Sequence, residues 1–245
     1  LGLAPAEFTW RAGVDVLCDC TPLVDGIGQG TGILPPWVRE GGPEKMLERI
    51  KDPATRARLR TDCDRYWRFI HRGDWHRVRM LQSNVYPELA GKSFPEIAKM
   101  WGKDEWETYF DLLAAHGTEM DNVMFVGQLF TDQHVADMVG HPLFMLAVDS
   151  YTGTIDGPLS EQLKHPLSFI GMIHYIAYHV REKGTLRLEE AVRKMTSMPA
   201  THFQLKGRGF VTPGSFADLV VFDYEGLKET STLQDPLHYA EGVEH

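Results

Sequence analysis

Two aspartates follow short runs of residues that the sequence predicts to be strands. Asp149 ends the run 144–148, which is apolar at every position, and Asp19 ends the β-prone run 14–18. Continuous apolarity is typical of a strand buried on both faces of a parallel sheet. Functional residues of parallel α/β folds lie at the carboxyl ends of strands, where a carboxylate can bind a metal or accept a proton from water. Aspartate is also common in the turns that end strands, so position alone leaves a structural role open for both.

His165 is the histidine of most interest among the eleven in the chain. It follows Asp149 by about one loop and begins the next predicted helix, which could return it to the same edge of the sheet. His174 and His179 lie five residues apart on that helix, a spacing that places them on different faces of an α-helix.

The elements that must position these residues alternate between helices and strands. We predict strands at 14–18, 78–83, 122–126, 144–148 and 219–222, and helices at 43–51, 53–72, 94–101, 103–116, 131–139, 166–183 and 188–195. The Gly- and Pro-rich segment 25–36 is predicted to be irregular. The fold class is therefore α/β, and the long segment at about 24–121 reads as a helical insertion between two strands.

The predicted helix 53–72 concentrates arginine and aromatic residues, a composition that also occurs in nucleic-acid-binding proteins. Its arginines are spread around the helix and interleaved with Asp62 and Asp64, which favours a solvated, salt-bridged face. The chain has no glycine-rich phosphate loop and no Gly-x-Ser-x-Gly motif.

Composition excludes several classes of protein. The 245 residues carry a formal charge of −9 and are 43% hydrophobic, which excludes a disordered chain. The acidic balance argues against a nucleic-acid partner, because neutralising phosphate requires clustered Lys and Arg. No apolar run approaches the roughly 18–20 residues of a membrane helix, so we expect no membrane partner.

The three cysteines indicate a reduced protein, and we expect a cytoplasmic location because their number is odd. Cys18 and Cys20 share one face of a strand. Structural zinc sites usually require two residues between paired cysteines and a second pair, so we predict that both are small hydrophobic residues of the core.

The C-terminal part carries a more specific pattern. Residues 188–200, the segment Gly207-Arg208-Gly209, the turn Pro213-Gly214 and residues 217–223 resemble the closing segment of the amidohydrolase superfamily. In that superfamily a helix leaves a (β/α)8 barrel and the chain returns to a small β-sandwich. The resemblance implies that residues 1–200 are the C-terminal part of a TIM-type barrel containing the insertion, and that residues 201–245 are part of a sandwich.

Within the superfamily, the chain resembles the N-acyl-D-amino-acid deacylases, also called D-aminoacylases. Family motifs are matched along the chain by Leu34-Pro35-Pro36-Trp37, Glu40-Gly41-Gly42, Asp52-Pro53 with Arg56, Gly91-Lys92-Ser93 with Glu96-Ile97-Ala98, Val148-Asp149-Ser150 and His165-Pro166. The match covers essentially the whole chain. The family's early His-x-His motif, its bridging Cys or Lys and its two later histidines have no counterpart here, so we expect the chain to be incomplete and inactive alone.

The resemblance also implies a reaction. Asp149 would end the eighth barrel strand and serve as metal ligand and catalytic base in zinc-dependent hydrolysis of a linear amide, an N-acyl amino acid or a related N-acyl compound. His165, Ser150 and Asp19 would bind substrate. Most zinc ligands are expected upstream of this chain, the expected partner is a small-molecule amide, and a homo-oligomer is left open.

The departures from the family motifs keep other functions open. Cys20, Thr21 and Leu23 replace Gln, Tyr and Tyr, Ser150 replaces Gly, and Leu167 replaces the Arg of His-Pro-Arg, which removes a candidate carboxylate-binding group. One alternative is a cyclic amide hydrolase of the hydantoinase or dihydroorotase kind. Others are a non-catalytic amidohydrolase-like subunit or binding module, and an independent α/β domain unrelated to the family.

Overall fold

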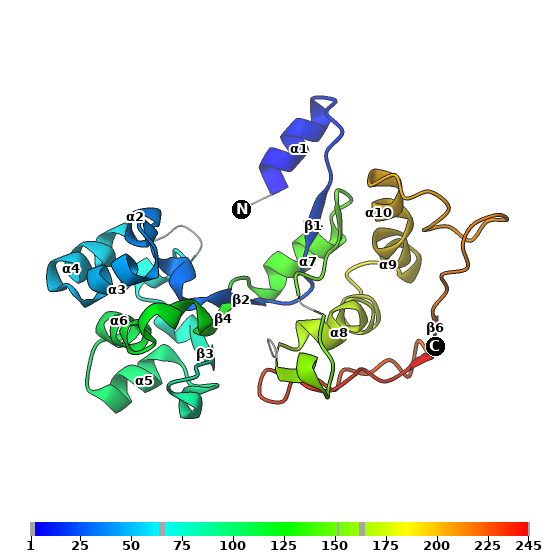
Figure 1. Ribbon diagram of the computed structural model, residues 1–245. Helices are drawn as coiled ribbons and strands as arrows, with labels where there is room; N and C mark the ends of the chain where they lie inside the picture. The colour runs from blue at the N-terminus through cyan, green and yellow to red at the C-terminus, as the bar shows by residue number, and fades with distance from the viewer. Residues whose placement is uncertain (1–2, 64–66, 151, 162–164, 245) are drawn as a thin grey trace. The chain divides into compact units, whose positions relative to one another are not determined.

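The computed structural model describes residues 3–63, 67–150, 152–161 and 165–244 (Figure 1). The chain divides into two compact units. The first consists of Leu1–Val24 together with Phe130–His245, and the second is Asp25–Leu129. The second unit overlaps the segment 24–121 that the sequence places as an insertion.

The first unit is built around a parallel pair of strands. β1 (Cys18–Cys20) pairs with β5 (Phe144–Leu146) in the register Cys18 to Phe144 and Cys20 to Leu146. The pairing continues beyond β5, where the amide of Ala147 donates to the carbonyl of Cys20 at 3.0 Å. Cys20, Phe144 and Leu146 are buried in one hydrophobic cluster, against which Cys18 packs. The prediction that both cysteines belong to the core is confirmed.

The helices of the first unit are α7 (Asp132–Gly140), α8 (Leu167–His174), the π-helix η7 (Tyr175–Glu182), α9 (Leu188–Met195) and α10 (Ser197–His202), with α1 (Leu3–Arg11) at the start of the chain and the 3-10 turn η6 (Pro158–Glu161) (Figure 1). Side chains of α7, α9 and the π-helix lie in the same hydrophobic cluster as the strand pair. The fully buried Lys194 on α9 donates to the carbonyls of Val139 and His141 at 2.7 and 2.6 Å. The Lys194 ammonium therefore binds two carbonyls at the C-terminus of α7, where the last carbonyls of a helix have no partner within the helix itself.

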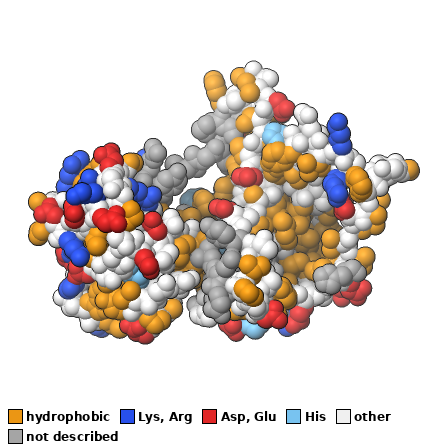
Figure 2. All heavy atoms as spheres, in the orientation of Figure 1, with side chains coloured by type: hydrophobic (Ala, Val, Ile, Leu, Met, Phe, Trp, Pro, Cys, Tyr) orange, Lys and Arg blue, Asp and Glu red, His pale blue; other side chains and the backbone are white. Residues whose placement is uncertain are grey.

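The C-terminal segment of the first unit contains little regular structure. β6 (Val221–Phe222) and β7 (Val243–Glu244) form a two-residue antiparallel pair. Figure 2 shows hydrophobic side chains gathered around a hollow in this unit. The hollow is a pocket of about 650 Å³ whose lining includes Ile176, Val192 and Leu219.

The second unit has its own sheet and its own core (Figure 1). β2 (Asp25–Gln29), β4 (Met124–Gln128) and β3 (Val78–Gln82) form an antiparallel sheet in the order β2-β4-β3. Its helices are α2 (Pro36–Arg39), α3 (Pro43–Lys51), α4 (Pro53–Asp62), α5 (Phe94–Trp101) and α6 (Glu105–Ala115). Short 3-10 turns complete it: η1 (Gly30–Ile33), η2 (Ile70–Arg72), η3 (Trp75–Arg77), η4 (Pro87–Leu89) and η5 (Gly117–Asn122).

Glycines in two strands of this sheet make room for the buried Trp67. A Cβ added to Gly127 in β4 would lie 2.7 Å from Cη2 of Trp67, and one added to Gly28 in β2 would lie 3.1 Å from Cζ2. Glycine inside a strand often marks such a close approach. The prediction that 25–36 is irregular is therefore wrong for Asp25–Gln29, where the glycines serve packing instead of a turn.

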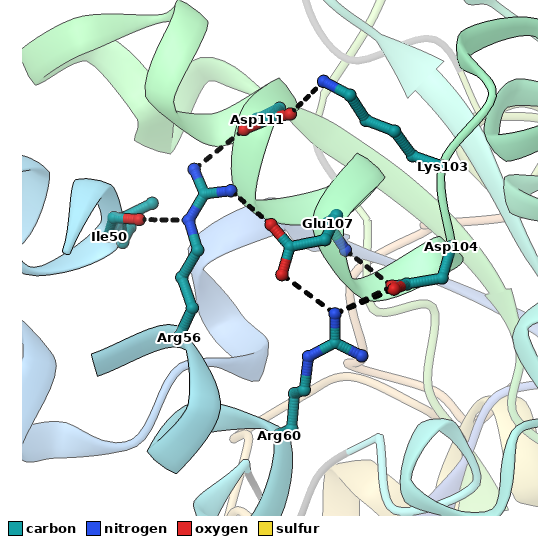
Figure 3. Close-up of polar contacts among 7 residues, drawn as sticks. All are labelled: Ile50, Arg56, Arg60, Lys103, Asp104, Glu107 and Asp111. Carbon is teal, nitrogen blue, oxygen red and sulfur yellow. Dashed lines mark hydrogen bonds and ion pairs between the residues drawn. The ribbon is translucent and has the colours of Figure 1, made fainter. Parts of the chain in front are cut away.

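Three acidic residues at the start of α6 and on its outer turns bind arginines of α4 (Figure 3). Arg56 contacts Glu107 at 2.6 Å and Asp111 at 2.8 Å, while Arg60 contacts Glu107 at 2.8 Å and Asp104 at 2.9 Å. Burial acts to raise the pKa of each carboxyl group, but hydrogen bonds from the cations outweigh it, and each pKa lies below its ordinary value. The network joins α4 to α6 and its N-cap through residues that are 44 or more positions apart in sequence.

Several element boundaries differ from the prediction. The helix predicted at 53–72 ends at Asp62, because Cys63 is extended at φ −63° and ψ 151° and Trp67, Phe69 and Ile70 then enter the core from turns. The strand predicted at 14–18 is Cys18–Cys20, and the strand predicted at 219–222 is Val221–Phe222. The helix predicted at 166–183 changes from α-helix to π-helix at Tyr175. None of the helices among the described residues is long and apolar enough to span a membrane.

We predict that Gly127→Ala lowers the free energy of unfolding by about 1–3 kcal/mol, because the new methyl group overpacks against the rigid ring of Trp67. Urea unfolding of the whole chain measures the change. Gly32→Ala is the matched control, since a Cβ there meets nothing within 4 Å. Equal stability of Gly127→Ala and the unmodified chain would contradict the proposed packing role.

We predict that Arg56→Gln lowers the free energy of unfolding by about 1–2 kcal/mol at neutral pH, because two half-buried carboxylates each lose one of their two cations and keep only Arg60 or Lys103. The carboxyl pKa values are lowered in the folded state, so this contribution is present above the ordinary carboxyl pKa of about 4 and is lost as pH falls through the lowered values. Urea titrations at pH 7 and pH 3 measure the difference. Lys45→Gln, which removes an exposed pair with Glu48, should change stability by less than about 0.5 kcal/mol.

Candidate functional site

Asp149 lies in the loop that follows β5, three residues beyond the end of the strand. Its side chain is exposed and makes no hydrogen bond or ion pair with any residue that the structure describes. The amide of Ser150 donates to the carbonyl of Val148 at 2.8 Å, which turns the chain tightly at this aspartate. A carboxylate held in this way is available to a substrate or a metal ion.

The Asp149 loop is fixed to the start of α8 by two contacts. The hydroxyl groups of Ser150 and Ser168 form a hydrogen bond. Val148 packs on Gly171 so closely that a Cβ there would lie 3.2 Å from both of its methyl groups. The helix that follows the loop therefore determines where the loop lies.

His165 stands just before α8 and is fully buried. Its Nδ1 accepts a hydrogen bond from the amide of Leu167 at 3.2 Å, which assigns the proton of the neutral ring to Nε2. Nε2 is buried and has no hydrogen-bond partner among the described residues. Burial lowers the pKa of His165 to about 4, so the imidazole is neutral at pH 7 and offers an unused N–H donor.

Asp19 occupies a different place from the one predicted. It lies in the middle of β1 instead of after it, opposite Met145 of β5. Because side chains alternate along a strand, Asp19 is exposed on the face opposite the buried Cys20. The structure thus joins Asp149, Ser150 and the start of α8, and it places Asp19 before the carboxyl end of the strand pair.

The π-helix supports the neighbouring loop through a histidine that the sequence did not single out. The fully buried His179 contacts the carbonyl of Pro22, in the loop after β1, through Nε2 at 2.9 Å. Burial lowers the pKa of His179. His179 and His174 were predicted to lie on different faces, yet their ring centroids are 5.2 Å apart. A π-helix forms hydrogen bonds between residues five apart, which brings such residues to the same face. The five-residue spacing of His174 and His179 was therefore the sequence signal for their contact.

The described residues contain no group of three or more His, Cys, Asp or Glu side chains that could hold a metal ion. Zinc in proteins takes three or four ligands from such residues. An exposed carboxylate such as that of Asp149 is suitable as one of them. The part of the chain that is described can therefore contribute to a metal centre but does not form one.

The chain matches the model of the amidohydrolase family over residues 137–241. An N-acyl-D-glutamate deacylase of Alcaligenes xylosoxydans xylosoxydans is 33% identical over 170 residues, which are 69% of this chain and 31% of the relative. An N-acyl-D-aspartate deacylase of the same organism is 28% identical over 209 residues, which are 83% of this chain and 39% of the relative. The resemblance predicted from the sequence is confirmed.

The fold is similar to that of a solved N-acyl-D-glutamate deacylase from Bordetella bronchiseptica, which was crystallised with zinc and a phosphonate inhibitor. The TM-score is 0.68 at 22% identity, over 99% of this chain and 40% of that one. The likeness confirms an amidohydrolase-type α/β fold. The chain spans less than half the length of the relatives it matches.

We predict that the buried His165 makes folding stability rise with pH between about 4 and 6.5. Its folded pKa is below the ordinary value of 6.5, so the unfolded chain binds more protons in that window and stability is lost as pH falls. His165→Asn keeps an acceptor for the Leu167 amide. It should reduce the change in unfolding free energy between pH 4 and 6.5 by up to about 3 kcal/mol. Urea unfolding between pH 4 and 7 measures it. The same flattening in His202→Asn, at an exposed histidine, would argue against His165 as the source.

Proposed function

Because the chain resembles the N-acyl-D-amino-acid deacylases of the amidohydrolase superfamily, we propose that it supplies the catalytic base for hydrolysis of a linear amide. The substrate class is an N-acyl amino acid or a related N-acyl compound. The observation that carries the proposal is the carboxylate of Asp149, which is exposed and unpaired among the described residues at the carboxyl end of a parallel strand.

Asp149 performs two proton transfers in this proposal. Its carboxylate accepts a proton from the water that attacks the amide carbonyl carbon, so that the water oxygen bonds to that carbon. The same carboxyl group then donates the proton to the leaving nitrogen as the C–N bond breaks. The turn at Val148 and the contact of Ser150 with Ser168 fix the backbone that carries this carboxylate.

His165, Ser150 and Asp19 are assigned to substrate binding. Neutral His165 has a donor on Nε2 without a partner among the described residues, suited to an oxygen atom of the substrate. Ser150 adjoins the base and carries a hydroxyl group that both donates and accepts. Asp19 lies on the exposed face of β1, where a carboxylate would accept from a substrate N–H group.

Zinc is the proposed cofactor, with Asp149 as one ligand and the remaining ligands outside the described residues. When bound, zinc lowers the pKa of water to about 7 and polarises a carbonyl group. The deacylase from Bordetella bronchiseptica, whose fold this chain shares, was crystallised with zinc. The likeness in fold supports the assignment.

The finer architecture is also part of the proposal. We assign residues 1–200 to the closing part of a (β/α)8 barrel with its insertion, and residues 201–245 to part of a β-sandwich. The parallel pairing of β1 with β5 supports the barrel, since all strands of such a barrel are parallel. The odd number of cysteines supports a cytoplasmic location.

We predict that Asp149→Asn, made in the full-length protein encoded by the gene of this chain, lowers kcat on N-acyl-D-amino acids by at least about 10³-fold, because the amide cannot accept the proton. Asp156→Asn is the matched control, since Asp156 is also exposed and lies in the same loop region. Circular dichroism checks that both variants fold.

Activity and zinc-binding measurements on the same proteins separate the alternative functions. Activity of Asp149→Asn within a few-fold of the unmodified enzyme would refute the assigned role. An unmodified protein that folds and binds zinc but hydrolyses neither linear nor cyclic amides would favour a non-catalytic subunit. Hydrolysis of hydantoins or dihydroorotate in preference to N-acyl amino acids would favour a cyclic amide hydrolase.

A further inference from the structure

The second unit carries a pocket of about 650 Å³ with a mixed polar and apolar lining, which we name the arginine pocket. It is bordered by Pro35 and Pro36, by residues 61–63 at the end of α4, and by Arg68, His71 and Arg72. No part of the proposed amide hydrolysis uses these residues.

Arg68 and Arg72 differ from the other described arginines of the second unit. The others donate to a backbone carbonyl or a carboxylate: Arg39, Arg49, Arg56, Arg58, Arg60, Arg77 and Arg79. Arg68 and Arg72 are exposed and bind no carbonyl or carboxylate among the described residues. Both line the arginine pocket, so the two arginines that lack such a partner among the described residues border the same hollow.

The remaining polar groups of the pocket do not neutralise this pair. The carboxylate of Asp62 is bound by Arg58 at 2.8 Å. His71 uses Nε2 to contact the carbonyl of Cys63, a contact that joins the two sides of the pocket. Among the described residues that line the pocket, the charges of Arg68 and Arg72 are therefore not balanced by a carboxylate, in a chain whose formal charge is −9, and they would attract anions locally.

The shape of the cation and the apolar part of the pocket lining indicate what kind of anion fits. A guanidinium group presents a planar set of donors that matches the two oxygens of a carboxylate. Pro35 and Pro36 supply an apolar wall, which an inorganic ion would not use. A ligand that combines a carboxylate with a short apolar group satisfies both.

We propose that the arginine pocket is a binding site for a small organic carboxylate, held by Arg68 and Arg72 and packed against Pro35 and Pro36. The site belongs to the second unit alone and does not depend on the proposed hydrolysis. It gives this unit a ligand-binding role of its own.

Isothermal titration calorimetry of the whole chain with hexanoate tests the proposal. We expect saturable 1:1 binding that weakens with added salt and falls at least about tenfold in the double variant Arg68→Gln, Arg72→Gln. Arg187→Gln, which removes an exposed arginine of the first unit, should bind hexanoate as the unmodified chain does. Circular dichroism checks that the variants fold.

Two further ligands identify the chemistry that is recognised. Hexanamide, which keeps the apolar group without the charge, should bind at least about tenfold more weakly than hexanoate, and inorganic phosphate should also bind more weakly. Absence of saturable hexanoate binding, or equal affinity in the double variant, would overturn the proposal. Phosphate binding as tight as hexanoate binding would overturn the organic carboxylate as ligand.

Discussion

The parallel pairing of β1 with β5 is the interaction on which the first unit depends. Three residue pairs bring together segments that are more than 120 positions apart, and the Asp149 loop begins where this ladder ends. α7, α9 and the π-helix pack against the same face of the pair. The strand pair thus defines both the core of the unit and the edge from which its candidate functional residues project.

Polar side chains of the first unit hold its loops in place. Lys194 binds the end of α7, His179 binds the loop after β1, and Ser150 joins the Asp149 loop to α8. Each joins one element to another: Lys194 and His179 bind backbone carbonyls, and Ser150 binds the hydroxyl group of Ser168. A short two-stranded ladder has few hydrogen bonds of its own, so these side chains contribute much of the precision at its carboxyl end.

The sequence predicted those helices and strands whose formation depends on neighbouring residues alone. The capping box of Ser93 and Glu96 and the continuous apolar run before Asp149 were sufficient for α5 and β5. β2 was missed because its glycines resemble a turn unless the position of Trp67 is known. The place of Asp149 after a strand could be predicted, but the tautomer of His165 depends on the amide of Leu167 and on burial. The contact of His174 with His179 depends on a π-helix, which tertiary packing selects.

The second unit has a consequence for the order in which the chain folds. Its β2 and β4 place Asp25 opposite Gln128, and the amide of Phe130 donates to the carbonyl of Val24 just beyond them. Closing a loop of about 100 residues costs conformational entropy before any contact is gained. A nascent chain that first forms the antiparallel sheet has already brought residues 24 and 130 together. The search that joins β1 to β5 then spans only the short segment from Cys20 to Val24 and the segment from Phe130 to Phe144, which contains α7. An inserted segment of this length therefore need not slow the formation of the strand pair.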